Sequence, residues 1–251
     1  MFDAHFHTDI SYCTEGGMTL DFISRAIREG DNLDGIAVTD HSFAVYFPED
    51  VAWSWEYMWN SGVFDSFRES GDERMAEYLQ SLKERRGDGI VPGLETEIMH
   101  DGRFTFSPEF RKDIDVLIGS VHYLAYPPNA SAEEIFETWL DNTMRLINSG
   151  IDILGHPFRW ISDRVAISDR TIREVVAEAV RNDVVLEFNS HFEIDTDSKM
   201  IDEIIAHDAK IAFSTDSHNR NEAGDFSYQL NLLEKKGVSL SDLNVFIGTS
   251  K

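Results

Sequence analysis

Cysteine is almost absent from this sequence: Cys13 stands alone among 251 residues. A single cysteine excludes an internal disulfide, and we therefore expect a reducing, cytoplasmic compartment. Long apolar runs are missing as well, because no stretch of about 18 apolar residues is present that could span a membrane. The opening segment MFDAHFHTDI lacks the basic residues and the apolar run of a signal peptide, so we expect none.

Basic residues are scarce: 22 Lys and Arg stand against 46 Asp and Glu, which gives a formal net charge of −24 at pH 7. So acidic a chain repels phosphate backbones and anionic lipid, and neither nucleic acid nor a membrane is expected as its main partner. Bound divalent cations would offset only part of this charge. The sequence indicates no particular oligomeric state.

Short apolar, β-rich runs alternate with longer stretches of helical periodicity along the whole chain. The seven runs are MFDAHFH, LDGIAVTD, DGIVPGLETEI, IDVLIGSVHYL, IDILGHPF, VVLEFNS and KIAFSTDSH. Helices are predicted over 19–29, 72–86, 131–149, 169–182, 198–208 and 221–236. Strands of this kind, separated by helices, indicate an α/β fold with a covered parallel sheet. We expect one domain over 1–251, a closed TIM-like barrel; an open doubly wound sheet is the alternative.

Two stretches interrupt this alternation. Residues 43–71 have little strand character, and we expect an insertion after the second strand that folds over the barrel mouth. Its tryptophans, Trp53, Trp55 and Trp59, are expected to clamp the insertion onto the barrel; stacking on an imidazole of the substrate is the alternative. The second stretch, HDGRFTFS, carries an Asp-Gly turn signal and predicts a small hairpin.

Nearly every predicted strand ends in a residue type that binds metals, and these ends converge on one mouth of a parallel barrel. The residues are His5, His7, Asp40, His41, Glu95, His122, His156, Asp216 and His218. Residues i and i+2 of a strand face the same side, so His5 and His7 can bind one cation, as can Asp216 and His218. Imidazoles with carboxylates suit Zn²⁺, Fe²⁺ or Mn²⁺, and a carboxylate such as Glu95 can bridge two ions. The donors suffice for two or three cations.

The other three histidines carry a weaker signal. His100, in the predicted hairpin, and His207, in a helical stretch, are expected at the surface. His191 follows the sixth strand and is expected to line the pocket without binding a metal.

The motifs HFH, TDH, GLE, GSVH, GHP and STDSH, spread from residue 5 to residue 218, resemble those of the PHP (polymerase and histidinol phosphatase) family. The resemblance implies a distorted (β/α)₇ barrel with a trinuclear metal centre at its mouth and hydrolysis of phosphate esters. A chain of this length with IGSVHYL is similar to the monofunctional histidinol phosphatases. A small phosphate monoester, with histidinol phosphate as the leading candidate, is therefore the expected substrate, and a nucleotide phosphodiester is an alternative.

The resemblance also implies which residues hold each cation. The first site would use His5, His7, Glu95 and Asp216, the second Glu95, His122 and His156, and the third His41, His218 and a residue of the loop after the first strand. Several members have a histidine at that loop position, where this chain has Cys13. A thiolate there would favour Zn²⁺ or Fe²⁺, whereas a thiol would only pack; we expect ligation.

The expected chemistry is attack on phosphorus by a hydroxide that bridges the metals, with the third metal or a protonated histidine stabilising the leaving oxygen. His41 and His218 are the candidates for that histidine if the third metal is absent. Asp216 and Arg159 complete the candidate catalytic residues. Arginine matches two phosphate oxygens, and Arg159, close after the GHP motif, is the first candidate for phosphate binding, with Arg164 the second.

Three more polar residues have expected supporting roles. Glu187 and Asn189 share one face of the sixth strand, and both are candidates to hydrogen-bond the ligands or the substrate; filling a polar layer below the metals is the alternative. Asp40 is expected to orient the imidazole of His41.

Two rival functions fit parts of this pattern. Amidohydrolase barrels also begin with HxH, but they usually end in a lone aspartate and bridge their metals with a carboxylated lysine. Here the last motif is DSH and the bridging position is Glu95, which favours a phosphoesterase. A metal-binding protein without activity would have lost ligands, and only the position of Cys13 departs from the family pattern.

Overall fold

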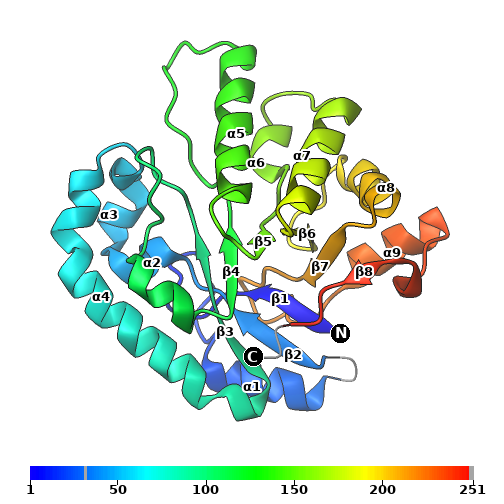
Figure 1. The fold of residues 1–251 in the computed structure, drawn as a ribbon. Helices are drawn as coiled ribbons and strands as arrows, with labels where there is room; N and C mark the ends of the chain where they lie inside the picture. Colours follow the sequence, from blue (N-terminus) through cyan, green and yellow to red (C-terminus); the bar gives the residue numbers. More distant parts are fainter. Residues whose placement is uncertain (31–32, 249–251) are drawn as a thin grey trace.

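The computed structural model describes residues 1–30 and 33–248, and its centre is a curved, wholly parallel sheet (Figure 1). Eight strands follow one another in chain order: β1 (Phe2–Phe6), β2 (Gly35–Val38), β3 (Ile90–Thr96), β4 (Val116–Gly119), β5 (Ile153–Leu154), β6 (Val185–Asn189), β7 (Lys210–Ser214) and β8 (Asn244–Val245). The first seven strands coincide with the seven predicted runs. The fold is thus α/β, a distorted TIM-like barrel, as expected.

The barrel closes between the end of β7 and β1. The backbone N–H of Asp216 donates to the carbonyl of His5 (2.9 Å), and that of His7 donates to the carbonyl of Ser217 (3.3 Å). The short β8 pairs instead with the beginning of β7 and was not predicted. Closure therefore fixes the two histidines at the end of β1, His5 and His7, beside the last metal-ligand motif of the chain.

Helices cover the outside of the barrel (Figure 1). The six that were predicted are α1 (Leu20–Glu29), α4 (Ser61–Glu84), α5 (Ala132–Ile147), α7 (Asp169–Arg181), α8 (Asp197–His207) and α9 (Ser227–Lys236). Side-chain caps mark several of their beginnings: Ser131 and Glu134 form a capping box on α5, and Ser168 accepts the N–H of Thr171 on α7. No helix of the described residues is long and apolar enough to cross a membrane.

The predicted insertion after β2 is helical rather than irregular. It contains α2 (Ser42–Tyr46), α3 (Glu49–Ser54), the 3₁₀ turn η1 (Glu56–Met58) and the first turns of α4, which begins well before the predicted start. Gly71 permits this packing, because a Cβ there would lie 2.2 Å from a ring carbon of Tyr46. The Tyr46 hydroxyl donates to Asp72 of α4 (2.6 Å), which holds α2 against α4. The predicted hairpin is reduced to one antiparallel bridge, between Ile98 and Phe104.

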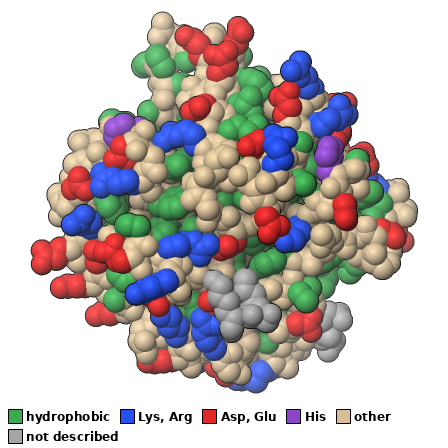
Figure 2. All heavy atoms as spheres, in the orientation of Figure 1, with side chains coloured by type: hydrophobic (Ala, Val, Ile, Leu, Met, Phe, Trp, Pro, Cys, Tyr) green, Lys and Arg blue, Asp and Glu red, His purple; other side chains and the backbone are tan. Residues whose placement is uncertain are grey.

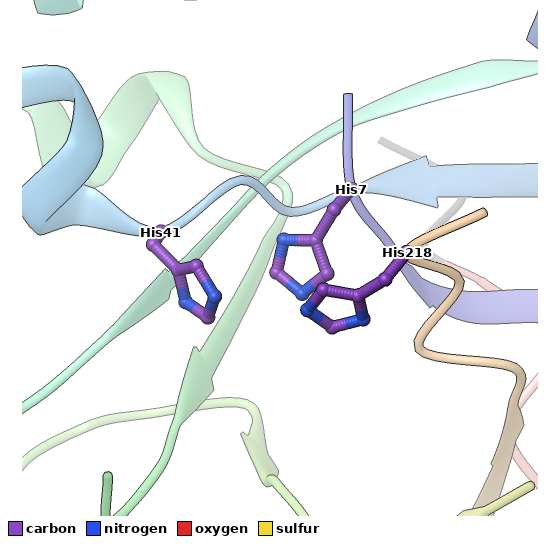
Figure 3. Close-up of side chains that lie close together, drawn as sticks. All are labelled: His7, His41 and His218. Atoms are coloured by element: carbon purple, nitrogen blue, oxygen red, sulfur yellow. The ribbon is translucent and has the colours of Figure 1, made fainter. Parts of the chain in front are cut away.

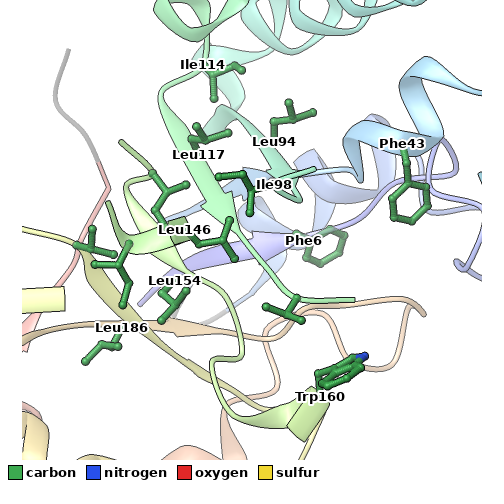
Figure 4. Packing of buried hydrophobic residues seen from close by; sticks show 14 of the residues in the cluster. Phe6, Phe43, Leu94, Ile98, Ile114, Leu117, Leu146, Leu154, Trp160 and Leu186 are labelled. Carbon is green, nitrogen blue, oxygen red and sulfur yellow. The ribbon is translucent and has the colours of Figure 1, made fainter. Parts of the chain in front are cut away.

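Apolar side chains fill the space between sheet and helices (Figure 4). A smaller buried cluster consists of strand residues: Ala4, Ala37, Val116, Ile118, Ile153, Val185 and Ala212. Because side chains alternate along a strand, Val185 shares its face with Glu187, and Ala212 shares its face with Ser214. The polar residues at the strand ends thus rest on a floor of apolar side chains.

We expect Gly93→Ala in β3 to destabilise the barrel by about 1–3 kcal/mol, the usual cost of overpacking. An added Cβ would lie 2.5 Å from the Thr39 methyl and about as close to two backbone carbonyl oxygens, those of Val38 (2.9 Å) and Val116 (3.0 Å). Urea unfolding of metal-free protein measures the change. Gly87→Ala is the matched control, since nothing lies within 4 Å of a Cβ there. Equal stability of the two variants would contradict this account of the packing.

Candidate metal centre

Of the nine ligands that the family resemblance implied, all but Cys13 lie together at the C-terminal mouth of the barrel. They form overlapping groups, and within each group the ligand atoms are within 4.8 Å of one another. They are His5, His7, His41, Glu95, His122, His156, Asp216 and His218. Figure 3 shows three of them, His7, His41 and His218, close together although they come from the ends of β1, β2 and β7. His122 and His218 are partly exposed, and the other six are buried.

The first group joins the two histidines at the end of β1 to two carboxylates. His7 Nε2 lies 2.9 Å from Asp216 Oδ1, and His5 Nε2 lies 3.4 Å from Glu95 Oε2. The two Nε2 atoms are only 3.1 Å apart. The Nδ1 atoms are engaged elsewhere, that of His5 with Glu187 (2.7 Å) and that of His7 with Ser11 Oγ (3.1 Å). With the ring hydrogens on Nδ1, electron pairs of nitrogen and oxygen converge on one point, which a cation would satisfy.

The second group lies on the other oxygen of Glu95. Glu95 Oε1 is 3.2 Å from His122 Nε2 and 3.1 Å from His156 Nε2. The Nδ1 atom of His122 donates to Glu97 Oε1 (2.7 Å), so its Nε2 is the nitrogen left for a metal. One oxygen of Glu95 thus faces each group, which is the arrangement of a bridging carboxylate.

The third group comprises His7, His41 and His218. His218 Nδ1 donates to the carbonyl of Asp216 (2.7 Å), which leaves its Nε2 without that commitment. His41 Nδ1 lies 2.6 Å from Glu95 Oε2, yet neither atom has a hydrogen-bond partner among the described residues.

Unpartnered buried atoms test whether metals fit this site. Among the described residues they include His41 Nδ1, His156 Nδ1 and Glu95 Oε2, all inside the centre. Buried polar atoms are normally satisfied, and leaving one unpaired costs about 1–3 kcal/mol. The donors are imidazole nitrogens and carboxylate oxygens, which suit Zn²⁺, Fe²⁺ or Mn²⁺. The residues present fit divalent cations.

The electrostatic environment keeps the carboxylates charged. Burial alone would raise the pKa of Glu95, but the neighbouring His122, His5 and His41 outweigh it and hold that pKa well below its usual value. The same balance lowers the pKa of Asp216, with His5 as the largest opposing charge. Both carboxylates are therefore in the form that binds cations.

Residues behind the ligands fix their orientation, and sequence reasoning found only some of them. Glu187 points into the barrel, as its strand face indicated, and holds His5. Asp40 does not contact the imidazole of His41; its carboxylate accepts from Thr8 and from Ser11 Oγ (2.7 Å), and Ser11 in turn holds His7. Glu97 was missed, although its i+2 spacing from Glu95 places both on one strand face.

The ligands open into a cavity with aromatic walls. Its lining comprises Cys13, His41, Phe43, Trp53, Trp55, His122, Arg159, His191, Phe192, Asp216 and His218. Trp55 stacks on Tyr123 with ring centroids 5.5 Å apart, as a clamp would, and Trp53 and Trp55 also line the cavity. Trp59 packs near Tyr123 (5.6 Å) instead.

Cys13 lies on this cavity wall but belongs to none of the ligand groups found among the described residues. Cys13 is exposed at the cavity wall, where desolvation and the negative charges of Glu95 and Asp216 raise the pKa of its thiol to about 12. Cys13 thus lines the same cavity as His41 and His218, and its ligation stays a prediction.

The predicted substrate-binding residues fall in three different places. Arg159, the first residue of α6 (Arg159–Ser162), lines the cavity, with its guanidinium carbon 3.3 Å from the ring centroid of Phe192. Arg164 is exposed and packs on Trp160 (4.0 Å) outside the cavity lining. Asn189 is buried behind the lining and donates to Asp216 Oδ2 (2.9 Å). Asn189 thus positions a metal ligand rather than facing the substrate.

Three histidines lie outside the predicted ligand set. His100 is exposed, and His207 is half-buried on α8, where it bonds the carbonyl of Glu203. His191 lines the cavity and pairs with Glu222.

Comparison with known proteins places this centre in a family. The family model described as PHP domain matches residues 3–191. This chain belongs to the PHP domain family. The family membership predicted from the six motifs is confirmed, and the matched segment contains the ligands at the ends of β1 to β5.

Two known proteins show how far the similarity extends. The PHP chain is 24% identical over 131 residues to the DNA polymerase/3'-5' exonuclease PolX of Bacillus subtilis (strain 168), and the match covers 52% of this chain but 22% of that protein. It also superimposes on the histidinol phosphate phosphatase HisK of Lactococcus lactis subsp. lactis Il1403, crystallised with zinc, L-histidinol and phosphate. That match has a TM-score of 0.56 at 20% identity and covers 95% of this chain and 94% of the other. The second likeness supports the fold.

We expect Glu97→Gln to weaken cation binding at the His122 group by about 10–100-fold, the usual effect of removing a carboxylate that orients a histidine ligand. Competition titration of Zn²⁺ against a chromophoric chelator measures it. Glu109→Gln serves as the control, because Glu109 is exposed and remote from the ligand groups. Unchanged affinity in Glu97→Gln would show that His122 does not depend on this pair.

Proposed function

We propose that this PHP domain is a metal-dependent phosphoesterase that hydrolyses a small phosphate monoester. The observation that carries the proposal is Glu95, whose two oxygens face separate histidine groups beneath a cavity that Arg159 lines. Two or three divalent cations would be held by these groups. When bound, such cations neutralise phosphate oxygens and activate water near neutral pH.

Arg159 supports an anionic substrate. It makes no hydrogen bond or ion pair with another side chain of the described residues, and its guanidinium is stacked on Phe192 at the cavity wall. Stacking leaves the edge of the guanidinium available, and that edge matches two phosphate oxygens. It is also the one arginine or lysine of the cavity lining described here.

Two further cavity residues have proposed roles at the leaving oxygen. His41 and His218 both line the cavity; a cation held by their group would stabilise that oxygen, and without that cation the two imidazoles are the candidates to do so. Asp216 is fixed by Asn189 (2.9 Å) and aligns His7 (2.9 Å). The catalytic set is therefore His41, Asp216, His218 and Arg159.

Histidinol phosphate is the leading specific candidate. The HisK structure of similar fold holds zinc, L-histidinol and phosphate. In this chain, Phe43, Trp53 and Trp55 line the cavity with aromatic rings, and aromatic rings can stack on an imidazole.

Two alternatives have weaker support. The partial match to PolX favours a nucleotide phosphodiester, but the net charge of −24 opposes a polyanion. Acidic side chains at four-residue spacing, Asp65, Glu69, Glu73 and Glu77, are exposed on α4, and Figure 2 shows acidic residues along that edge. An amidohydrolase is opposed by Glu95 at the bridging position.

We expect purified protein to hydrolyse p-nitrophenyl phosphate with added Mn²⁺, Zn²⁺ or Fe²⁺ and to lose this activity to a chelator. Glu95→Gln removes the bridging charge, and kcat/KM should fall by roughly 100-fold or more. Glu109→Gln controls for the loss of a surface carboxylate. Absence of hydrolysis with every metal and with histidinol phosphate would reject the phosphatase, and full activity in Glu95→Gln would reject the proposed centre.

We expect Arg159→Ala to raise KM for phosphate esters by about 10–100-fold, because it removes a charge-assisted hydrogen bond to the phosphate. Steady-state kinetics over a range of substrate concentrations measures this change. The matched variant is Arg164→Ala, which removes an arginine from the same connection between β5 and α7 but outside the cavity and should leave KM unchanged. An equal effect of both variants would point to loop folding rather than phosphate binding.

A further inference from the structure

His191 lines the cavity, and a carboxylate holds its imidazole in place. Its Nδ1 lies 3.0 Å from Glu222 Oε1. The other oxygen of Glu222 accepts the backbone N–H groups of His218 (2.7 Å) and Asn219 (3.3 Å). Glu222 is therefore fixed by the turn that follows β7, and it fixes His191 in turn.

The same construction occurs at two histidines of the metal centre. His5 is held by Glu187 and His122 by Glu97, each at 2.7 Å between Nδ1 and a carboxylate oxygen. In such pairs the carboxylate sets the tautomer and leaves Nε2 as the metal-binding nitrogen. His191 and Glu222 repeat this pair on the cavity wall, beside His218.

The position of His191 also suits a ligand. Its ring is stacked on that of His218 with centroids 4.7 Å apart. Ligand atoms of His191, His218 and Glu222 lie within 4.8 Å of one another, whereas Cys13 enters no such group among the described residues.

We propose that His191, held by Glu222, is a ligand of the third cation together with His218. In this chain His191 would thus supply the donor that the family resemblance placed in the loop after β1, at Cys13. The inference rests on the metal centre of the proposed function and is independent of which ester is hydrolysed.

Metal content per protein tests the assignment. Protein loaded with Zn²⁺ and freed of excess metal is analysed by inductively coupled plasma mass spectrometry. His191→Ala should carry one equivalent fewer than wild type, and Glu222→Gln should bind the last equivalent about 10–100-fold more weakly. His207→Ala, which removes a half-buried histidine of α8, should match wild type.

Cys13→Ser separates the two candidate donors. Retention of all wild-type equivalents in Cys13→Ser, with a loss in His191→Ala, supports the proposal; a loss in both variants adds Cys13 as a further ligand and still supports it. A wild-type metal count in His191→Ala overturns it. Thermal unfolding of the metal-free variants checks that each is folded. Wild-type protein that binds no cation at all would instead overturn the metal centre of the proposed function.

Discussion

The buried carboxylate of Glu95 is the interaction on which the rest of the site depends. Isolated in an apolar interior, an ionised carboxylate would be expensive, and it remains charged here because histidines from four strand ends surround it. The barrel brings those strand ends to one mouth. The histidine nitrogens lie so close together that divalent cations, rather than protons alone, would satisfy their electron pairs.

A second layer of polar groups gives the centre its geometry. An imidazole has two nitrogens, and a ligand is defined only when one of them is committed elsewhere. Glu187, Glu97, Glu222 and the Asp40–Ser11 pair each hold an Nδ1 atom from behind. These partners come from different strands and loops, so the precision of the centre is a property of the closed barrel.

Much of the fold could be read from the sequence because buried parallel strands are continuous apolar runs and the helices between them are amphipathic. The exceptions have physical causes. The first turns of α4 contain Gly62 and Gly71 and become helical because Tyr46 packs against the bare backbone of Gly71. The strand β8 has only two residues and is too exposed to give a strand pattern in the sequence, and only its pairing with β7 makes it a strand.

By itself the sequence determined the ligands at the strand ends, because strand alternation and barrel geometry leave them only one direction to face. It could not decide the roles of residues at and beyond those ends. Arg159 and Arg164 lie in one connection, between β5 and α7, yet one lines the cavity and the other packs on Trp160. Asn189, at the end of β6, donates to Asp216, and His191, just beyond it, pairs with Glu222. The connections have no strand periodicity, and a strand face does not select a partner, so the tertiary contacts alone decided where these side chains point.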